Sequence, residues 1–182
     1  MNKNGFTLIE VIAVLTILGV LLGMAVKRVD LERARLDSSV HATTLTLNAA
    51  QRKAALRQHD IVVAMLEADD QLRIHDDVDS DGVVDDGEEV RFVTFADGVV
   101  FGRGGAPNHP ELGSAAITFG EKQGPHPAVA FHRNGSASAF TGFYLTFGSS
   151  NDALHTRAIR INRATGETRC YSYRTGAWEA EC

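Results

Sequence analysis

The chain has 182 residues, a formal net charge of −5 at pH 7 and 44% apolar residues. With a sequence pI of about 5.8, it lacks the basic balance typical of a nucleic-acid-binding domain. An apolar segment lies near the N-terminus, and the roughly 120–130 residues beyond it are enough for one domain with its own hydrophobic core.

The apolar segment is residues 5–27, GFTLIEVIAVLTILGVLLGMAVK. About twenty apolar residues are enough to cross a bilayer as one helix. Glu10 is a single carboxylate inside this run, and ionised groups at such positions usually have a partner. A secretory signal peptide is cut after its apolar core, whereas the obvious cleavage point here, between Gly5 and Phe6, precedes it. We therefore predict that residues 6–29 remain on the mature protein as a transmembrane helix.

The pattern G-F-T-L-I-E-V at residues 5–11 resembles the leader junction of type IV pilins and of the pseudopilins of type II secretion. The resemblance implies that residues 1–5 are a prepilin leader, that a prepilin peptidase cleaves after Gly5, and that Phe6 becomes N-methylated. It also implies insertion into the lipid bilayer of the bacterial inner membrane. Assembly with other pilins or pseudopilins into a periplasmic filament would then follow, on an inner-membrane assembly platform.

Glu10 would be the fifth residue of the mature protein. In an assembled filament, the nearest candidate partner for its carboxylate is the positively charged α-amine of a neighbouring subunit. The alternative is a single-pass anchor in which Glu10 reaches the membrane interface. That alternative leaves the short leader and the position of Gly5 unexplained.

Beyond Lys27 the sequence becomes amphipathic, and we predict that the helix continues over residues 30–58. Read from Phe6, the helix would have about 50 residues and a length of roughly 80 Å. Three apolar residues fall outside its main stripe and favour a broad buried face: Leu45, Ala49 and Leu56. The main stripe, at helical spacing, consists of Leu36, Val40, Leu47, Ala50 and Ala54.

Residues 59–182 contain short apolar runs separated by turn residues, and this pattern predicts a periplasmic, β-rich head. Asn134-Gly135 is a strong hairpin signal and Thr165-Gly166 a weaker one. The predicted fold class is α+β, with a long N-terminal helix packed on an antiparallel sheet or sandwich, as in pilins. The predicted strands are residues 61–66, 71–74, 89–95, 99–102, 115–120, 128–133, 143–148, 157–162 and 168–173.

Several features of the head extend the resemblance to the GspH/FimT group of minor pseudopilins. These are the Ala-rich helix end at residues 49–56, an acidic D-x-D-x-D-G stretch, a block at residues 117–138, and the final strand-turn-strand at residues 157–171. The resemblance implies a structural subunit at the tip or in the initiation of a type II secretion pseudopilus. One alternative is a FimT-like minor type IV pilin involved in pilus assembly or DNA uptake. Another is an adhesin or calcium-dependent binding module on a pilin-type anchor.

Catalytic motifs are not found in the sequence. It contains no G-x-S-x-G elbow, no H-E-x-x-H helix, no C-x-x-C pair and no glycine-rich phosphate loop. We therefore predict a protein that is not an enzyme and has no organic cofactor.

The acidic stretch at residues 75–90 fits a calcium loop of the EF-hand type, counted from Asp77 as position 1. Gly82 then occupies position 6, where the loop turns sharply. The alternative is a solvated acidic β-turn, which Asp-Gly steps also favour. The flanks are predicted strands, so we expect an affinity of about 10⁻⁴–10⁻³ M, as in extracellular modules. The predicted ligands are Asp77, Asp79, Asp81, Val83 through its carbonyl, Asp85 and Glu88.

The C-terminal third is locally basic, and some FimT-like pilins bind DNA through a basic motif near this region. Here the corresponding turn contains Glu167 where the resemblance would place an arginine, so a solvated sheet face is favoured and nucleic acid is not a predicted partner.

Cys170 and Cys182 both lie in the last thirteen residues. In an oxidising compartment such a pair usually forms a disulfide; the alternative is two free thiols in a frayed tail.

Overall fold

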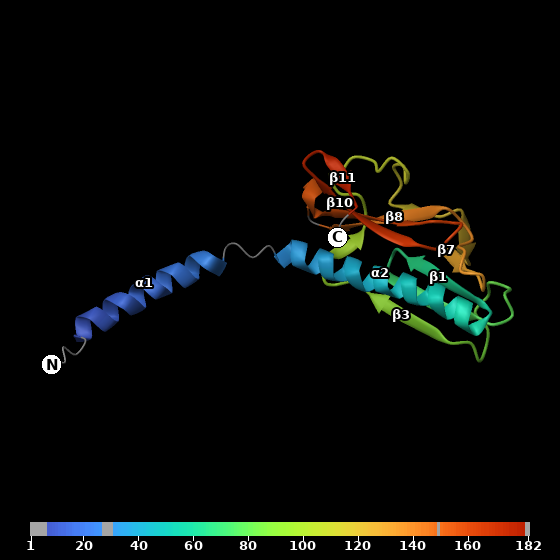
Figure 1. The fold of residues 1–182 in the computed structure, drawn as a ribbon, viewed down its shortest axis with the longest axis horizontal. Coiled ribbons are helices and arrows are strands. Elements are labelled where there is room, and N and C mark those ends of the chain that lie inside the picture. Colours follow the sequence, from blue (N-terminus) through green and yellow to red (C-terminus); the bar gives the residue numbers. More distant parts are fainter. Residues whose placement is uncertain (1–6, 27–30, 149, 181–182) are drawn as a thin grey trace. The chain divides into compact units, whose positions relative to one another are not determined.

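The computed structural model describes residues 7–26, 31–148 and 150–180 (Figure 1). The chain divides into two compact units, Met1–Leu31 and Glu32–Cys182. The first contains helix α1 (Leu8–Val26), and the second is a head built around helix α2 (Leu31–Arg57). The strands of the head are β1 (Asp60–Leu66), β2 (Gln71–Asp77), β3 (Val90–Thr94), β4 (Val99–Phe101), β5 (Ile117–Thr118), β6 (Glu121–Gln123), β7 (His126–Phe131), β8 (Thr141–Phe147), β9 (Thr156–Ile161), β10 (Thr168–Arg174) and β11 (Ala177–Glu179), with a short 3-10 helix, η1 (Ala153–His155).

Helix α1 is apolar on all sides. Its side chains from Leu8 to Leu21 are exposed within its own unit, and a helix of this kind needs an apolar environment to be covered. The predicted continuous helix passes through residues 27–30, which lie outside the described residues. Within the described residues, the structure contains no helix with the length and apolarity needed to cross a membrane.

Helix α2 buries one narrow face against the sheets. The predicted stripe is confirmed, because all five of its residues are buried. The prediction of a broad buried face is wrong: Leu45 is 52% exposed, Leu56 is 83% exposed and Ala49 is also exposed. The small polar residues Ser39 and Thr43 also lie on the buried face, where the Ser39 hydroxyl accepts a hydrogen bond from the Ala96 N–H at 2.9 Å.

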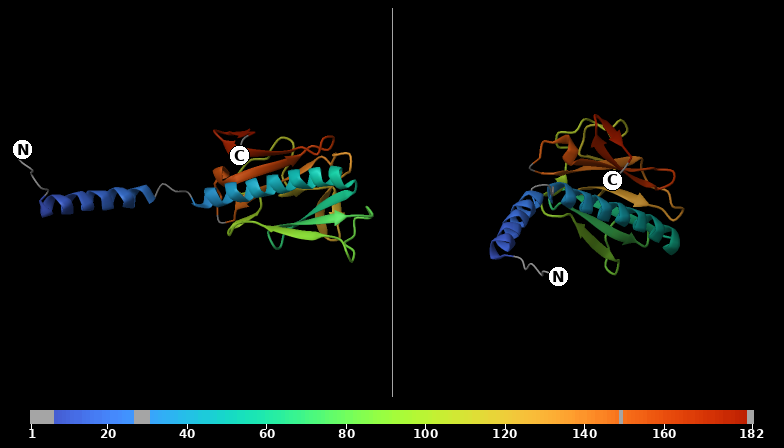
Figure 2. Two further views of the ribbon diagram at one scale, coloured as in Figure 1. Left: turned by 60° about the horizontal axis from the view of Figure 1, so that its bottom comes forward. Right: turned by 60° about the vertical axis from the view of Figure 1, so that its left-hand side comes forward.

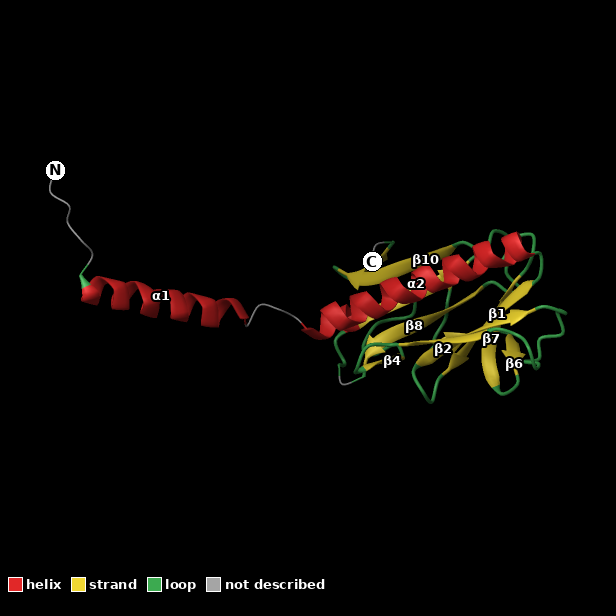
Figure 3. Ribbon diagram, turned by 90° about the horizontal axis from the view of Figure 1, so that it is seen from below, coloured by secondary structure: helices red, strands yellow, loops and turns green. Residues whose placement is uncertain are grey.

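The strands form two antiparallel sheets, which confirms the predicted fold class. One has the order β3-β2-β1-β7-β6, and the other β11-β10-β9-β8-β4, with β5 also paired to β8. All nine predicted strands are present with shifted ends, while β6 and β11 were not predicted. In the left view of Figure 2, α2 lies between the green strands of the first sheet and the orange-to-red strands of the second, and Figure 3 shows it running across both.

The main core cluster joins α2 to both sheets. It contains Leu47 from the helix, Val63 and Val129 from the first sheet, and Leu145 and Ile159 from the second, all fully buried. Strand β1 is buried on both faces, because Val62, Ala64 and Leu66 form a second cluster with Ala128 on the far side of the sheet. This explains why its sequence is a continuous apolar run rather than an alternating one.

One predicted hairpin needs correction. Residues 132–136 do form a turn, with the Gly135 N–H donating to the His132 carbonyl at 2.8 Å and Gly135 at φ +82°. However, β7 and β8 on either side of it belong to different sheets, and the strand pairing across the turn, among the residues that the structure describes, is a single bridge from Phe131 to Ala137. The Thr165-Gly166 turn, in contrast, does join a paired hairpin, β9 and β10.

Candidate functional site

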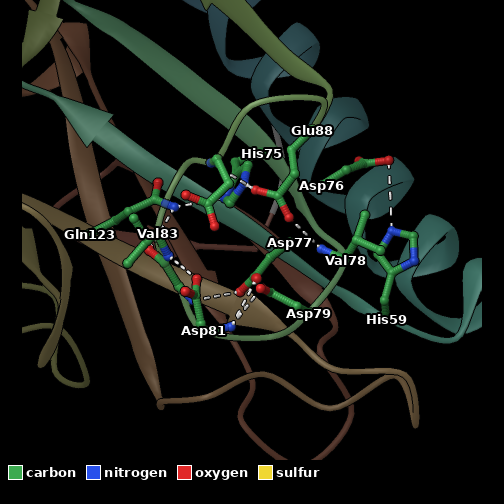
Figure 4. Close-up of polar contacts among 12 residues, drawn as sticks. His59, His75, Asp76, Asp77, Val78, Asp79, Asp81, Val83, Glu88 and Gln123 are labelled. Carbon is green, nitrogen blue, oxygen red and sulfur yellow. Dashed lines mark hydrogen bonds and ion pairs between the residues drawn. The ribbon is translucent and has the colours of Figure 1, made fainter.

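The acidic stretch connects β2 to β3 at one end of the first sheet (Figure 4). Asp77 is the last residue of β2 and is 2% exposed. Its two carboxylate oxygens accept hydrogen bonds from the Asp81 N–H at 3.1 Å and the Gly82 N–H at 2.9 Å. Burial raises the pKa of Asp77, and these two hydrogen bonds oppose that shift. The buried carboxylate therefore fixes the start of the loop.

Three of the predicted calcium ligands converge in this loop. One carboxylate oxygen from each of Asp77, Asp79 and Asp81 lies within 4.8 Å of the others. Gly82 has φ +77°, a left-handed conformation that glycine adopts without strain. Asp79 and Asp81 are exposed, so the open side of this cluster faces solvent.

The other three predicted ligands lie outside that group. Val83 donates its N–H to the Asp81 carboxylate at 2.7 Å, and Asp85 donates its N–H to Glu88 at 3.1 Å. Glu88 also accepts the Val78 N–H at 2.8 Å and lies 2.5 Å from Nε2 of the buried His75. The hydrogen bond to His75, followed by those from Asp85 and Val78, lowers the pKa of Glu88 to about 2.

Glu88 belongs to a hydrogen-bonded chain that anchors the loop to the sheet. Arg73 donates to the side-chain carbonyl of Gln123 at 3.0 Å, and the Gln123 amide donates to Nδ1 of His75 at 2.8 Å and to the Gly82 carbonyl at 3.1 Å. With its Nδ1 accepting, His75 donates from Nε2 to Glu88. The chain therefore holds Glu88 through residues of two strands, β2 and β6.

A second polar cluster joins the loop to the end of α2. Asp76, 2% exposed, lies 2.7 Å from the Lys53 ammonium and 3.0 Å from the Arg57 guanidinium. Lys53 also contacts Glu89, which begins the return to β3, at 3.0 Å. The helix end and both ends of the acidic loop are thus tied together by ion pairs.

The predicted processing residues are described only in part. Gly5 and Phe6 lie outside the described residues. Glu10 lies in the first turn of α1 and is the only ionisable residue of that helix. The N–H groups of Glu10 and Val11 both donate to the Thr7 carbonyl, at 3.1 and 3.2 Å. Within α1, the carboxylate of Glu10 is exposed and available to a partner outside the helix.

Residues 1–26 match the family model described as the prokaryotic N-terminal methylation motif. The chain carries this methylation motif. The match spans Gly5, Phe6 and Glu10, the three residues that the sequence predicts to direct processing and assembly. It does not extend into the head.

Two solved structures are similar to this chain over most of its length. The type IV minor pilin FimU of Pseudomonas aeruginosa is 17% identical over 83% of this chain and 97% of that chain, with a TM-score of 0.49. The minor pseudopilin EpsH from the Type 2 Secretion System of Vibrio cholerae is 18% identical over 75% of this chain and 94% of that chain, with a TM-score of 0.47. No curated protein sequence matches the chain.

The predicted disulfide involves one described residue. Cys170 is half-buried on β10 and packs against the main core. Cys182 lies outside the described residues, so its pairing with Cys170 stays a prediction.

Sequence reasoning did not identify the polar contacts that hold the acidic loop and α2 in place. His75 and Gln123 are 48 residues apart, and Arg157 and Asp37 are 120 apart. No local pattern links residues at such distances. A charged residue within a predicted strand, such as Arg157 in β9, was the available signal.

Proposed function

We propose that this chain is a pilin-type structural subunit, a minor pseudopilin of a type II secretion pseudopilus that acts at its tip or in its initiation. The observation that carries the proposal is the methylation motif at residues 1–26. It overlaps an apolar helix in which Glu10 is the only ionisable side chain. The proposed role is assembly rather than catalysis, in support of protein secretion across the outer membrane.

In this proposal a prepilin peptidase cleaves after Gly5 and methylates the new N-terminal Phe6. Residues 6–29 then anchor the chain in the bacterial inner membrane, and residues 59–182 form the periplasmic head. The exposed apolar side chains of α1 support this, because such a helix is stable only against lipid or other apolar helices. During assembly on the inner-membrane platform, helices of neighbouring subunits would replace the lipid.

Glu10 gives the assembly its specificity. A carboxylate in the hydrocarbon region costs roughly 2.5–3.5 kcal/mol on insertion scales, so it favours a state in which it is paired. The methylated α-amine of a neighbouring subunit would supply the opposite charge. Pairing would therefore favour a defined stagger between adjacent helices.

The experiment that tests processing is mass analysis of the N-terminal peptide, from membranes of cells with and without the prepilin peptidase. We expect N-methylated Phe6 in the first and intact Met1 in the second. Retention of Met1 on most of the protein in cells that contain the peptidase would contradict the proposal.

The second candidate is a FimT-like minor type IV pilin involved in pilus assembly or DNA uptake. Several basic residues of the C-terminal third are neutralised, which favours secretion over DNA binding. Arg157 is buried against Asp37, Arg160 lies 2.6 Å from Glu111, and Arg169 donates to Glu167 at 2.8 Å. Deletion of the gene would separate the two: loss of enzyme secretion supports a pseudopilin, and loss of pili or transformation supports a pilin.

A further inference from the structure

Strand β3 is the terminal strand of the first sheet, in the order β3-β2-β1-β7-β6. Figure 1 and the left view of Figure 2 both place it at the margin of the head, and no described strand pairs with its outer side. An open strand edge is a template on which another strand can pair. Natural proteins usually block such edges with proline, lysine or a bulge.

The hydrogen bonds to β2 define which backbone groups of β3 face outward. The Asp76 N–H donates to the Glu89 carbonyl at 2.9 Å, and the Phe95 N–H donates to the Asp70 carbonyl at 3.1 Å. Hydrogen-bonded pairs alternate along an antiparallel ladder, so residues 89, 91, 93 and 95 bond to β2. The outward N–H and C=O groups therefore belong to Val90, Phe92 and Thr94.

The β3 edge has three apolar residues, Val90, Phe92 and Val93, and one charged residue as its protection. Its sequence, VRFVT, has no proline or lysine. Phe92 is 55% exposed. The only cation of the strand, Arg91, has its guanidinium 3.4 Å from Glu89, so its charge is partly neutralised.

A groove of about 310 Å³ runs between β3 and α2. Its helix wall contains Leu45 and Ala49, two of the three α2 residues that were predicted to be buried and are exposed. Its strand wall contains Arg91, Phe92 and Val93, and Ile74 of β2 also lines it. The side chains of Arg91 and Val93 share the face of Ile74, while that of Phe92 points to the opposite face of the sheet. A strand added beside β3 would direct alternate side chains into this groove.

We propose that the β3 edge and this groove bind an extended segment of another protein by strand addition. Backbone pairing to Val90, Phe92 and Thr94 would provide the affinity, and an apolar side chain in the groove would provide selectivity. Arg52 lies one turn after Ala49, is exposed, and forms no ion pair within the described part of the chain. The fitting segment therefore carries a carboxylate next to its apolar residues.

A second copy of this chain fits the edge less well. In an antiparallel pair of β3 strands from two copies, centred on Phe92, two segments would meet. The acidic connection that precedes β3 in one copy would lie beside the turn that follows β3 in the other copy. That connection exposes Asp85 and Asp86, and the turn carries Asp97, whose side chain is 94% exposed and is paired with the exposed Arg35 at 3.3 Å. Like charges facing each other between strands are destabilising. The inference is independent of whether the chain enters a filament.

The test uses the full chain in detergent and a labelled seven-residue peptide that alternates valine with glutamate and threonine. A second peptide of the same sequence, the twin, carries N-methyl groups on alternate residues. These groups remove the N–H donors along one edge of that peptide. We expect saturable binding of the first peptide and at least 10-fold weaker binding of the twin. Phe92→Lys on β3 and Leu45→Glu on α2 should each raise the Kd at least 10-fold.

The matched controls are Phe140→Lys and Leu154→Glu, which replace exposed residues that do not line the groove. Their Kd should stay within twofold of the wild-type value. Leu45→Glu lies on the helix, so the test does not depend on the folding of a β3 variant. Equal affinity for the two peptides, no saturation up to 1 mM, or self-association that Phe92→Lys abolishes would each overturn the proposal.

Discussion

At the residue scale, the acidic loop brings three carboxylates close enough to repel one another and to share a cation. Asp77, Asp79 and Asp81 place carboxylate oxygens within 4.8 Å of one another, and unpaired negative charges at this spacing repel. A hard divalent cation with oxygen ligands would relieve that repulsion. The bonds from Glu88 to His75 and Val78 would have to rearrange for Glu88 to join the shell.

Calcium well above the millimolar range should therefore raise the melting temperature of the head by mass action. Asp79→Ala combined with Asp81→Ala should abolish the gain. The control is Glu67→Ala combined with Asp69→Ala, two exposed carboxylates in the turn before β2, which should retain it. Identical wild-type melting temperatures in calcium and in chelator would mean that the loop is only an acidic turn.

His109 gives the head a defined response to acid. It is 5% exposed, and its ring centroid is 4.5 Å from that of Tyr171. Its backbone N–H donates to the Tyr144 hydroxyl at 2.8 Å, and its ring Nδ1 accepts the Glu111 N–H at 3.2 Å. Burial lowers the pKa of His109 below its usual 6.5; Glu111 opposes this shift and Arg160 adds to it. Above pH 6.5 the ring is neutral in both the folded and unfolded chains. As the pH falls below 6.5, the unfolded chain takes up the proton first, so this group destabilises the folded state.

Thermal unfolding of the head at pH 7 and pH 5 checks that protonation of His109 destabilises the folded state. The drop in melting temperature between the two should be smaller in His109→Gln than in the wild type. His126→Gln, at a half-buried position, serves as the control and should keep the wild-type drop. The same drop in His109→Gln and in the wild type would contradict the assignment.

The predicted Cys170–Cys182 disulfide would tie β10 to the end of the chain. A loop of about a dozen residues contributes roughly 3 kcal/mol in the chain-entropy model, which is disputed. Non-reducing peptide mapping of periplasmic material should recover the linked pair. Alkylation of both thiols without prior reduction would rule it out.

At the element scale, α2 depends on one buried ion pair near its N-terminal end. Arg157 of β9 is 1% exposed and donates to Asp37 at 2.9 Å and to the Leu154 carbonyl at 2.7 Å. Asp37→Asn should destabilise the head by about 2–3 kcal/mol, because it leaves a buried guanidinium without its counter-charge. We place the loss below that of a fully buried pair because Asp37 is 42% exposed.

Denaturant unfolding of the head measures this loss. The control is Arg33→Gln, which removes the exposed cation 3.8 Å from the same Asp37 and should change the stability by less than about 1 kcal/mol. Equal effects of the two substitutions would show that burial of Arg157 is unimportant.

The elements that sequence reasoning recovered are those with strong local patterns. The α2 stripe follows helical periodicity, and nine strands follow apolar runs bounded by turn residues. Strand β6 was missed because its residues, Glu-Lys-Gln, include no apolar side chain, and β11, Ala-Trp-Glu, was missed because its apolar run is only two residues long. The Asn134-Gly135 turn was identified, but its partner strands were not, because sheet membership depends on contacts distant in sequence.

The candidate site was predictable to a similar degree. The spacing of Asp77, Asp79 and Asp81 predicted their proximity, and the positive φ of Gly82 fits its position in the loop. The partners of Glu88 were not predictable, because His75 is on β2 and its orienting residue, Gln123, is on a strand that was missed. Local sequence therefore identified the loop but not its anchoring.

At the scale of the whole molecule, the chain joins an apolar helix with one carboxylate to a head that has its own core. The head is held by α2 and two sheets, and the methylation motif lies on the other unit. In the proposals made above, assembly is assigned to Glu10 on the first unit and recognition to a surface of the head on the second. A change at Glu10 should thus leave the head folded.

The central claim is that Glu10 directs filament assembly, and Glu10→Leu tests it most directly. Removing the charge removes its insertion cost, so the variant should enter the membrane at least as well as the wild type. The measurement is the fraction of protein recovered in sheared, cross-linked filaments, with Glu67→Leu on the head as the control. We predict that Glu10→Leu is membrane-inserted but absent from filaments, while Glu67→Leu is incorporated normally. Incorporation of Glu10→Leu at the wild-type level would contradict the account.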